Sequence, residues 1–466
     1  MKNIKIWLLL LAVVFSGGCD KDFDEINTNP NRPEDVPLTN VLLSATSLGV
    51  RRTHGANMNM TYAGLWAQHY AKIQYIDEDW YEYRPDAFTG HFDGLYSGPL
   101  ADLQSIINKA DNPSNMLAAA LTMKSYFMSI MTDMWGEIPY TEALDVNRAV
   151  NPAYDGQDVI YAGLIADLKT AADMFGQSDN LGVGDIIYAG DTGKWRKFAN
   201  SLRARLLNRA KHKNPAYATE LQNLLGNPAN LIASNDDNAF ITYPDATDNA
   251  NPIYSNKYND GRNDHVVSKT LVDILLASSD PRLPVYAELN DAGIYKGQPN
   301  GTVEPNPFTS VSQIGAAFRD DPAGPSVLFT YAEVKFIMAE ANSSKQAYLD
   351  GISASCAQHG VTADAGFLAT AGAAYDANTL GAVITQKWIA LFGDGCEAFT
   401  EFRRTGFPST VVEVPQSAYP GQGVPDRFAY PTSETGNNKL NLEAAIGRQG
   451  VDGTGIFQTV KMWWVL

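Results

Sequence analysis

The stretch TDMWGEIPYTEAL at residues 132–144 joins a long apolar-faced segment to a loop. Upstream of it, apolar residues recur at spacings of three and four, which is the pattern of one buried face of a helix. These residues are Leu117, Ala120, Leu121, Phe127, Met128, Met131, Met134 and Trp135. Gly136 permits a left-handed cap, and Pro139 cannot continue a helix. The residues at the mouth of this helix are Asp133, Trp135, Glu137 and Tyr140. The stretch therefore predicts the end of a buried helix, and a structural role is favoured over a catalytic one.

Helical periodicity extends over most of the chain and predicts a mainly α fold. The expected helices cover residues 38–50, 57–74, 91–111, 115–134, 156–176, 193–212, 265–277, 330–358, 377–393 and 395–404. Most connections before residue 215 are short, which favours antiparallel helix pairs packed side by side. No clean period of about 34 residues survives in the letters, so the sequence is compatible with a degenerate tetratricopeptide-like stack without proving it.

A change of composition marks an insert at about residues 226–330. Asn, Asp, Pro, Gly and Tyr crowd together there, which predicts irregular loops broken by the helix expected at 265–277. Long loops on a helical scaffold usually carry function or cover a core. We therefore expect one helical domain at residues 38–466 that contains a loop-rich ligand-binding part.

Composition and motifs disfavour several classes of function. The 466 residues carry a formal net charge of −17, which disfavours nucleic acid as a partner, because nucleic-acid affinity comes largely from phosphate neutralisation. The sequence contains no GxSxG elbow, HExxH motif, Walker loop or GxGxxG opening a helix. The six histidines show no metal-ligand spacing. We therefore predict no catalytic residue, no cofactor and no metal, and we expect a protein that is not an enzyme.

The first residues form a targeting segment. Two lysines precede an apolar run at residues 6–15 that is too short to span a bilayer. Small residues then lead into Cys19, and a cysteine in this position is the lipid acceptor of bacterial lipoproteins. We therefore predict a signal peptide at residues 1–18, lipidation of Cys19 and an acidic, Asn- and Pro-rich tether at residues 19–37. Ordinary secretion with an incidental cysteine is the alternative.

Two further cysteines, Cys356 and Cys396, remain once Cys19 is assigned to the lipid. An even pair in an exported protein is compatible with a disulfide bridge. Both residues fall in expected helices, where cysteine behaves as a small apolar core residue. Two free buried thiols are therefore favoured over a bridge.

Basic residues gather on the helix expected at 193–212. They are Arg196, Lys197, Arg203, Arg205, Arg209 and Lys211. On so acidic a chain, such a stripe is expected to pair with the protein's own carboxylates and not with phosphate. Arg403 and Arg404 are interpreted in the same way, with Glu397 and Glu401 as candidate partners.

An aromatic run just past a helix end is the most informative indication of a ligand site. It contains Tyr75, Trp80, Tyr81, Tyr83 and Phe88, interleaved with Asp77, Glu78, Asp79, Glu82 and Arg84. Rings in so polar a loop are hard to bury together, and exposed rings stack on the apolar faces of sugars while polar neighbours bind the hydroxyls. The predicted ligand-binding residues are Trp80, Tyr81, Tyr83, Tyr75, Asp79 and Arg84. Packing under the loop is the alternative, and it would move the site to the 250–320 loops around Tyr254, Tyr258, Tyr286 and Tyr295.

Taken together, these motifs resemble the SusD/RagB family of outer-membrane nutrient-binding lipoproteins, in its SusD-like branch. The matching pieces are FDEINTNPN at 23–31, TDMWGEIPYTEAL at 132–144, WRKFANSLRARLLNRA at 195–210, YAEVKFIMAEA at 331–341, QKWIALFGDGCEAFTEFRRTGFP at 386–408 and PDRFAYPTSE at 425–434. Each piece is weak alone, but the ordered set is specific and covers most of the chain after Cys19.

The resemblance implies tetratricopeptide-like helix pairs and a loop-rich ligand-binding part. It also implies a cell-surface lipoprotein of the outer membrane that captures oligosaccharides and acts as a lid on a SusC-like TonB-dependent transporter. Oligopeptide capture, which part of the family performs, is the alternative. A glycan hydrolase is disfavoured because the catalytic motifs are missing. The matching motifs look like scaffold, so the resemblance points to Trp80 and to the 250–320 loops by position alone.

Lipidation of Cys19 leads to a first testable expectation. Labelled palmitate should enter the wild-type chain and be lost from Cys19→Ala, because the substitution removes the thiol that follows the signal peptide. Incorporation is measured by metabolic labelling and gel fluorography. Label that persists in Cys19→Ala would contradict the assignment.

Overall fold

The computed structural model describes residues 36–82, 86–110, 112–145, 147–450 and 460–466. Cys19, the signal peptide and most of the expected tether lie outside these residues. The described helices are α3 (Leu38–Thr53), α4 (Thr89–Leu95), α5 (Ala101–Lys109), α6 (Asn115–Trp135), α7 (Gln157–Met174), α8 (Thr192–Ala210), α9 (Pro215–Leu225), α10 (Pro252–Tyr258), α11 (Lys269–Ser278), α12 (Leu283–Tyr286), α13 (Ala316–Arg319), α14 (Tyr331–Asn342), α15 (Lys345–Gln358), α16 (Ala365–Ala377), α17 (Thr379–Ala390), α18 (Gly395–Thr405), α19 (Thr432–Asn437) and α20 (Lys439–Gln449). Three short antiparallel strand pairs accompany them: β1 (Tyr70–Lys72) with β5 (His265–Val267), β2 (Ile138–Pro139) with β3 (Tyr154–Asp155), and β4 (Ala239–Ile241) with β6 (Ser326–Phe329). The predicted mainly α fold is confirmed.

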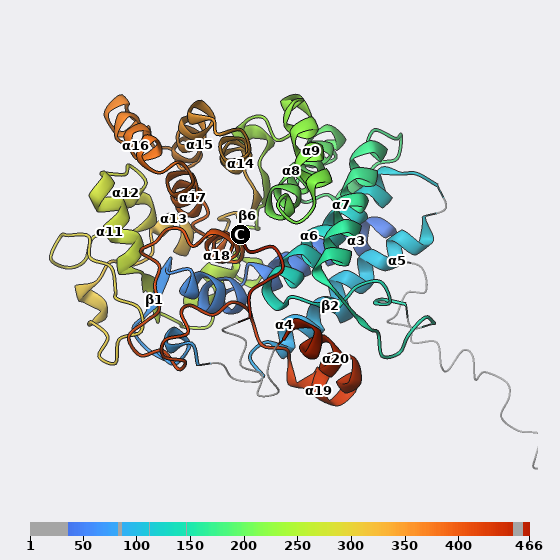
Figure 1. The fold of residues 1–466 in the computed structure, drawn as a ribbon, viewed down its shortest axis with the longest axis horizontal. Helices are drawn as coiled ribbons and strands as arrows, with labels where there is room; N and C mark the ends of the chain where they lie inside the picture. The colour runs from blue at the N-terminus through green and yellow to red at the C-terminus, as the bar shows by residue number, and fades with distance from the viewer. Residues whose placement is uncertain (1–35, 83–85, 111, 146, 451–459) are drawn as a thin grey trace, which may run out of the picture.

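Consecutive helices pack against one another as pairs. α6 contacts α7, α7 contacts α8 and α8 contacts α9, while α14 contacts both α15 and α17. Figure 1 shows α7, α8 and α9 with α14, α15 and α16 along the upper edge of the view, and α19 and α20 at the lower edge. No helix in the described part of the chain is long and apolar enough to cross a membrane.

Helix α6 is buried along most of its length, as its sequence predicts. The Ser114 side chain accepts a hydrogen bond from the Leu117 amide at the start, and Gly136 ends the helix with a φ of 88°. Trp135 is fully buried, and its indole N–H donates to the Ala429 carbonyl at 2.8 Å. The stretch that ends α6 is therefore structural.

Several expected helices are interrupted. The helix expected at 57–74 is a π-helix, η1 (Ala56–Gly64), and the chain then enters strand β1. The helix expected at 330–358 is divided into α14 and α15, because Ser343 adopts a left-handed conformation and Ser344 caps α15. The segment expected at 91–111 contains a second π-helix, η3 (Tyr96–Leu100), around Pro99. Helices α9, α10, α12, α13, α16, α19 and α20 lie outside the expected ranges, except for the last residue of α16. The first three residues of the helix expected at 265–277 form strand β5.

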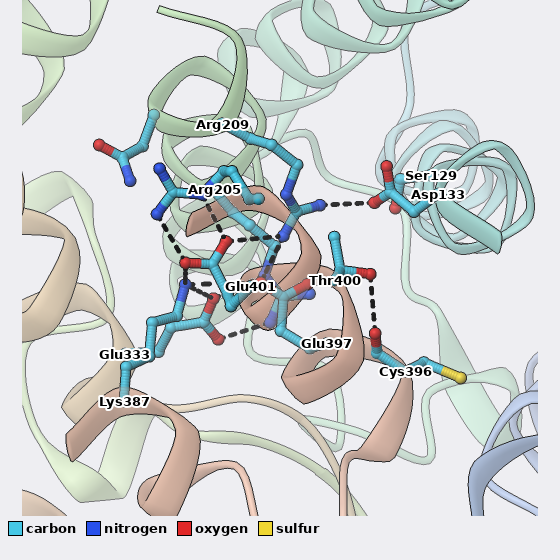
Figure 2. A network of polar contacts seen from close by, with 12 residues as sticks. Ser129, Asp133, Arg205, Arg209, Glu333, Lys387, Cys396, Glu397, Thr400 and Glu401 are labelled. Carbon is cyan, nitrogen blue, oxygen red and sulfur yellow. Dashed lines mark hydrogen bonds and ion pairs between the residues drawn. The ribbon is translucent and has the colours of Figure 1, made fainter. Parts of the chain in front are cut away.

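Figure 2 shows a network of buried charges that joins the central helices. Arg205 and Arg209 of α8 point toward Glu333 of α14 and Glu397 of α18, and Arg209 also pairs with Asp133 of α6. Lys387 of α17 lies 3.4 Å from each of three carboxylates. The carboxylates that Lys387 approaches are those of Glu333, Glu397 and Glu401. Five helices therefore meet through ion pairs that are almost completely removed from water.

The network keeps its central carboxylates ionised. Burial acts to raise the pKa of Glu401, but the charges of Arg404, Lys387 and Arg209 outweigh it and hold that pKa well below its usual value. The pKa of Glu397 is lowered in the same way, by Arg205, Arg209 and Lys387 against the effect of burial. Removal of one cation would therefore leave a buried charge uncompensated.

Most of the predicted charge pairings are confirmed. Lys197 pairs with Asp237, Arg203 with Glu220, Arg205 with Glu333, Arg209 with Asp133 and Glu397, Lys211 with Glu340, and Arg404 with Glu340 and Glu401. Arg196 differs, because its guanidinium donates to the backbone carbonyls of Ala172 and Phe175. Arg403 also differs: it donates to the Asp426 carbonyl and lies 3.9 Å from the centroid of the Phe399 ring.

The two described cysteines are free. Cys356 and Cys396 are both buried and unbridged, as predicted. Burial raises the pKa of the Cys396 thiol well above its usual value. Both thiols are therefore core residues without a nucleophilic role at neutral pH.

The network gives a stability prediction. Arg209→Met is expected to lower the free energy of unfolding by about 3–5 kcal/mol, because Asp133 and Glu397 lose a buried partner. Arg203→Met on the same helix is the matched control. Arg203 pairs with the partly exposed Glu220, and loss of such a pair costs about 0–1 kcal/mol. Urea denaturation followed by circular dichroism measures both losses, and equal losses would contradict a special role for the buried network.

Candidate ligand-binding site

The pairing of β1 with β5 brings two loops together that are far apart in the sequence. Tyr70 lies opposite Val267, and Lys72 lies opposite His265. The next residue along, Ile73, donates its backbone N–H to the Asp264 carbonyl at 3.0 Å. The loop that follows β1 and the loop that precedes β5 are therefore neighbours.

A buried lysine fixes both loops. The Lys72 ammonium lies 3.1 Å from the Glu78 carboxylate and 2.9 Å from the Asp264 carboxylate, and the Lys72 side chain is 1% exposed. Arg262 adds a second cation on Asp264, at 2.8 Å. Burial acts to raise the pKa of Asp264, but hydrogen bonds from Arg262 and the charge of Lys72 help to hold it well below its usual value. The carboxylate therefore stays charged and ties the two loops to one point.

Tyr75 projects from this anchored loop. Its side chain is 60% exposed, and the Arg262 guanidinium carbon lies 4.6 Å from the ring centroid. Its backbone is left-handed, with a φ of 51°. Such a conformation is costly for a residue with a bulky side chain, and conformations of this kind concentrate at functional sites. The fold thus holds a tyrosine ring in the solvent at a conformational cost.

Helix α10 adds two more rings. The centroids of Tyr254 and Tyr258 are 4.5 Å apart, and Tyr258 is 50% exposed. Lys257 lies 4.5 Å from the Tyr258 ring centroid and pairs with Asp320 at 2.6 Å. Arg262 connects this helix to Tyr75, because its backbone N–H donates to the Asn256 carbonyl. We call this set the tyrosine surface, and its members are Tyr75, Tyr254, Lys257, Tyr258 and Arg262.

The structure buries two of the predicted ligand-binding residues, Tyr81 and Asp79, and leaves Tyr75 exposed. Tyr81 is 1% exposed, its ring meets Trp66 edge-on, and its hydroxyl accepts a hydrogen bond from the Val414 amide. Asp79 is also 1% exposed and accepts a hydrogen bond from the Asn300 side chain at 2.9 Å. The expectation that these two residues contact a ligand therefore needs correction, because long-range packing removes both from the surface.

The remaining predicted residues have different outcomes. Tyr75 belongs to the tyrosine surface. Trp80 is half-buried, its carbonyl accepts a hydrogen bond from the Ala418 amide, and its buried indole N–H has no partner within the described chain. Tyr83 and Arg84 lie outside the described residues. Burial raises the pKa of Asp79 to about 6, although the Asn300 hydrogen bond and Lys72 oppose the shift.

Of the alternative tyrosines in the 250–320 loops, Tyr254 and Tyr258 lie on the tyrosine surface. Tyr286 does not, because it is fully buried and stacks on Phe392 at 4.5 Å. Arg262 escaped the sequence-based prediction, since its place over Tyr75 depends on the pairing of β1 with β5. The sequence predicts irregular loops around Tyr254 and Tyr258 and does not predict α10, although their i, i+4 spacing fits one face of a helix.

His69 is neutral and hydrogen-bonded in the core. His69 is buried, and its Nε2 atom lies 3.0 Å from the Trp388 carbonyl. Burial lowers the pKa of His69 to about 3, so the ring is neutral. No group of three or more His, Cys, Asp or Glu side chains that could hold a metal ion occurs among the residues that the structure describes. The tyrosine surface is thus suited to binding, with rings and paired charges as its working groups.

Comparison with known proteins identifies relatives over nearly the whole chain. A family model named SusD-like and described as "starch-binding associating with outer membrane" matches residues 30–431. A structure described as a chitin-binding protein is 26% identical, with a TM-score of 0.77 over 92% of this chain and 98% of the other. A chitin-binding SusD homolog from Flavobacterium johnsoniae is 23% identical, with a TM-score of 0.77 over 92% and 96% of the two chains. A SusD homolog from Bacteroides uniformis ATCC 8492 is 22% identical, with a TM-score of 0.79 over 93% and 100%. No curated protein matches the chain.

Proposed function

Because the chain belongs to the SusD-like family of starch-binding proteins associated with the outer membrane, we propose that it is a surface lipoprotein that binds oligosaccharides and delivers them to a SusC-like TonB-dependent transporter. The protein acts by binding and not by catalysis. Its tyrosine surface receives the ligand. The observation that carries the proposal is Tyr75, a ring that is 60% exposed on a loop fixed by buried ion pairs.

The chemistry of the surface supports a sugar as ligand. Rings such as Tyr75 and Tyr258 offer apolar faces to the CH groups of a sugar, and their hydroxyls and the nearby charged groups bind sugar hydroxyls. One relative, at 26% identity, is described as a chitin-binding protein, and the family description names starch. Both ligands are neutral polymers of hexose units.

The charges of the surface favour a neutral ligand over an oligopeptide. Arg262 is already paired with Asp264, and Lys257 is paired with Asp320. The charged termini of a peptide would have to compete with these internal partners, whereas sugar hydroxyls only add hydrogen bonds to them. Oligopeptide capture is therefore the second candidate.

The proposed location of the protein on the outer membrane rests on lipid attachment. We propose that Cys19 carries acyl chains that hold the protein on the outer membrane, facing outward. Several acyl chains together make such anchoring stable, since each buried methylene contributes about 0.8 kcal/mol. The residues that follow Cys19 would then serve as a tether between the lipid and the folded domain.

The ligand site is tested by calorimetric titration with maltoheptaose and chitopentaose. Tyr75→Ala and Tyr258→Ala are each expected to weaken binding of the ligand that the wild type prefers by roughly 1–3 kcal/mol, or about 5- to 150-fold, as for other ring anchors in binding sites. Trp80→Ala tests whether Trp80 also contacts the ligand beside the tyrosine surface. Tyr217→Ala on α9, far along the scaffold, is the matched control and should bind as the wild type does.

The titrations distinguish three outcomes. Unchanged affinity in folded Tyr75→Ala and Tyr258→Ala would place the ligand elsewhere. Unchanged affinity in Trp80→Ala alone would show that Trp80 serves packing. A peptide pool that binds while both glycans do not would favour the second candidate.

The proposed partner is tested by affinity purification. A tagged chain solubilised from outer membranes in mild detergent should bring down a large TonB-dependent transporter in near-equal amount, because a captor without chemistry needs a pore for delivery. Mass spectrometry and gel densitometry measure the ratio. Recovery of this chain alone under the same conditions would count against the partnership.

A further inference from the structure

A cavity of about 310 Å³ lies outside the residues of the tyrosine surface. Most of its lining comes from α13, from the segment that leads into β6, from the start of α10 and from the C-terminal end of α15, and β4, α12, His54 and Gly393 complete it. The volume is near the lower end of the range of about 300–1,000 Å³ typical of small-molecule sites. The cavity is thus large enough for a small ligand and too small for a polymer.

Two phenyl rings give the cavity apolar walls. Phe240 lies on β4 opposite Val327 of β6, and both residues line the cavity. Phe318 on α13 is held in place from behind, with ring centroids 4.9 Å from Phe392 and 5.6 Å from Tyr286. Both phenyl rings are partly exposed, so part of each apolar surface is available to a ligand.

One polar group in the lining lacks a partner. The Nε2 atom of His359 is buried and makes no hydrogen bond within the described chain. Its ring is fixed by edge-on contact with Tyr286 at 5.2 Å. Burial lowers the pKa of His359 to about 4, so the ring is neutral at pH 7. A buried polar atom without a partner is costly, and it is expected to meet a hydrogen-bonding molecule from outside the chain.

Two other polar side chains around the cavity, His54 and Asn251, are already engaged within the chain. The His54 Nε2 atom lies 2.9 Å from the Val327 carbonyl. The Asn251 side chain donates to the Gly324 carbonyl at 2.8 Å and accepts from the Ile253 amide at 2.7 Å. These bonds hold His54 and Asn251 in place, whereas the buried Nε2 atom of His359 is without a partner in the described chain.

The charge of the lining limits the class of ligand. Asp321 contributes a carboxylate, and the lining contains neither lysine nor arginine. His54 is neutral as well, because burial lowers its pKa to about 4. Anions such as phosphate or a uronic acid would meet a carboxylate without a compensating cation. The lining suits a neutral molecule with both CH faces and hydroxyl groups.

We propose that this cavity is a second binding site, which takes a neutral monosaccharide or disaccharide. Phe240 and Phe318 contact the faces of the sugar, and His359 and Asp321 bind its hydroxyls. The site is separate from the tyrosine surface, and it does not depend on the function proposed for that surface.

Helix α13 offers a matched pair of variants. Ala316 and Ala317 are neighbouring exposed alanines, but only Ala317 lines the cavity. Ala317→Phe should fill the cavity, whereas Ala316→Phe adds the same ring outside it. Both are made in a chain that also carries Tyr75→Ala and Tyr258→Ala, so that the tyrosine surface lacks its two most exposed rings.

Saturation-transfer difference NMR on the full chain in detergent measures binding, with glucose, maltose and N,N′-diacetylchitobiose as probes. At least one probe should give a signal in the Tyr75→Ala/Tyr258→Ala background and in Ala316→Phe, and Ala317→Phe should reduce that signal at least about five-fold. A signal that is the same in Ala317→Phe, or absent for all three probes in the background, would overturn the proposal.

A second variant tests the site independently, in case Ala317→Phe does not fold. His359→Phe keeps a ring against Tyr286 and Phe318 but removes the Nε2 atom, and it should weaken binding several-fold. Unchanged binding in this variant would overturn the assigned role of His359. Thermal melts of all variants show that the fold is retained. Loss of oligosaccharide binding to the tyrosine surface, measured by the calorimetric titration, would be a separate result.

Discussion

The structure depends on two arginines of α8 that are buried among carboxylates. Arg205 and Arg209 reach α6, α14 and α18 at once, and their side chains are 3% and 1% exposed. Burial of an ion pair is costly, and it is offset only when the geometry is good and each charge has its partner. The helices can therefore dock in one arrangement, because any shift would leave a charge without a partner. Segments from TDMWGEIPY to the one around Arg404 supply the members of this network.

The same scaffold fixes the position of the tyrosine surface. Asn59 of η1 donates to the Gly393 carbonyl and accepts from the Gly395 amide, which attaches η1 to the start of α18. Gly395 has to be glycine, because a Cβ there would lie 2.3 Å from the Asn59 carbonyl oxygen. The chain continues from η1 into β1, and Lys72 at the end of β1 holds the loop of Tyr75. The exposed ring is thus connected to the buried network through a short series of rigid contacts.

The sequence predicted those features that depend on neighbours along the chain. The apolar face and the Gly136 stop of α6, and the pairing of Arg404 with Glu401 one helical turn away, are local. The sequence predicts Tyr81 and Asp79 at the surface because many charged residues surround them in the chain. Contacts with distant segments around Val414 and Asn300 bury them instead. The position of Arg262 over Tyr75 depends on the register of β1 with β5, and no local pattern encodes it.

Under the proposed function the protein must release what it binds, and a surface built from separate exposed rings fits that requirement. Each ring is expected to contribute roughly 1–3 kcal/mol to binding, which is too little for one ring to hold a ligand tightly once the cost of association is included. Arg262 and Lys257 are neutralised by Asp264 and Asp320, so the two cations add little long-range attraction for a ligand. In the proposed function, a polymer that spans several rings would be retained by their combined contacts, whereas each sugar unit could leave its ring separately. Exposed rings on a rigid scaffold would then combine capture of long chains with transfer unit by unit, which a deep and tightly closed pocket would prevent.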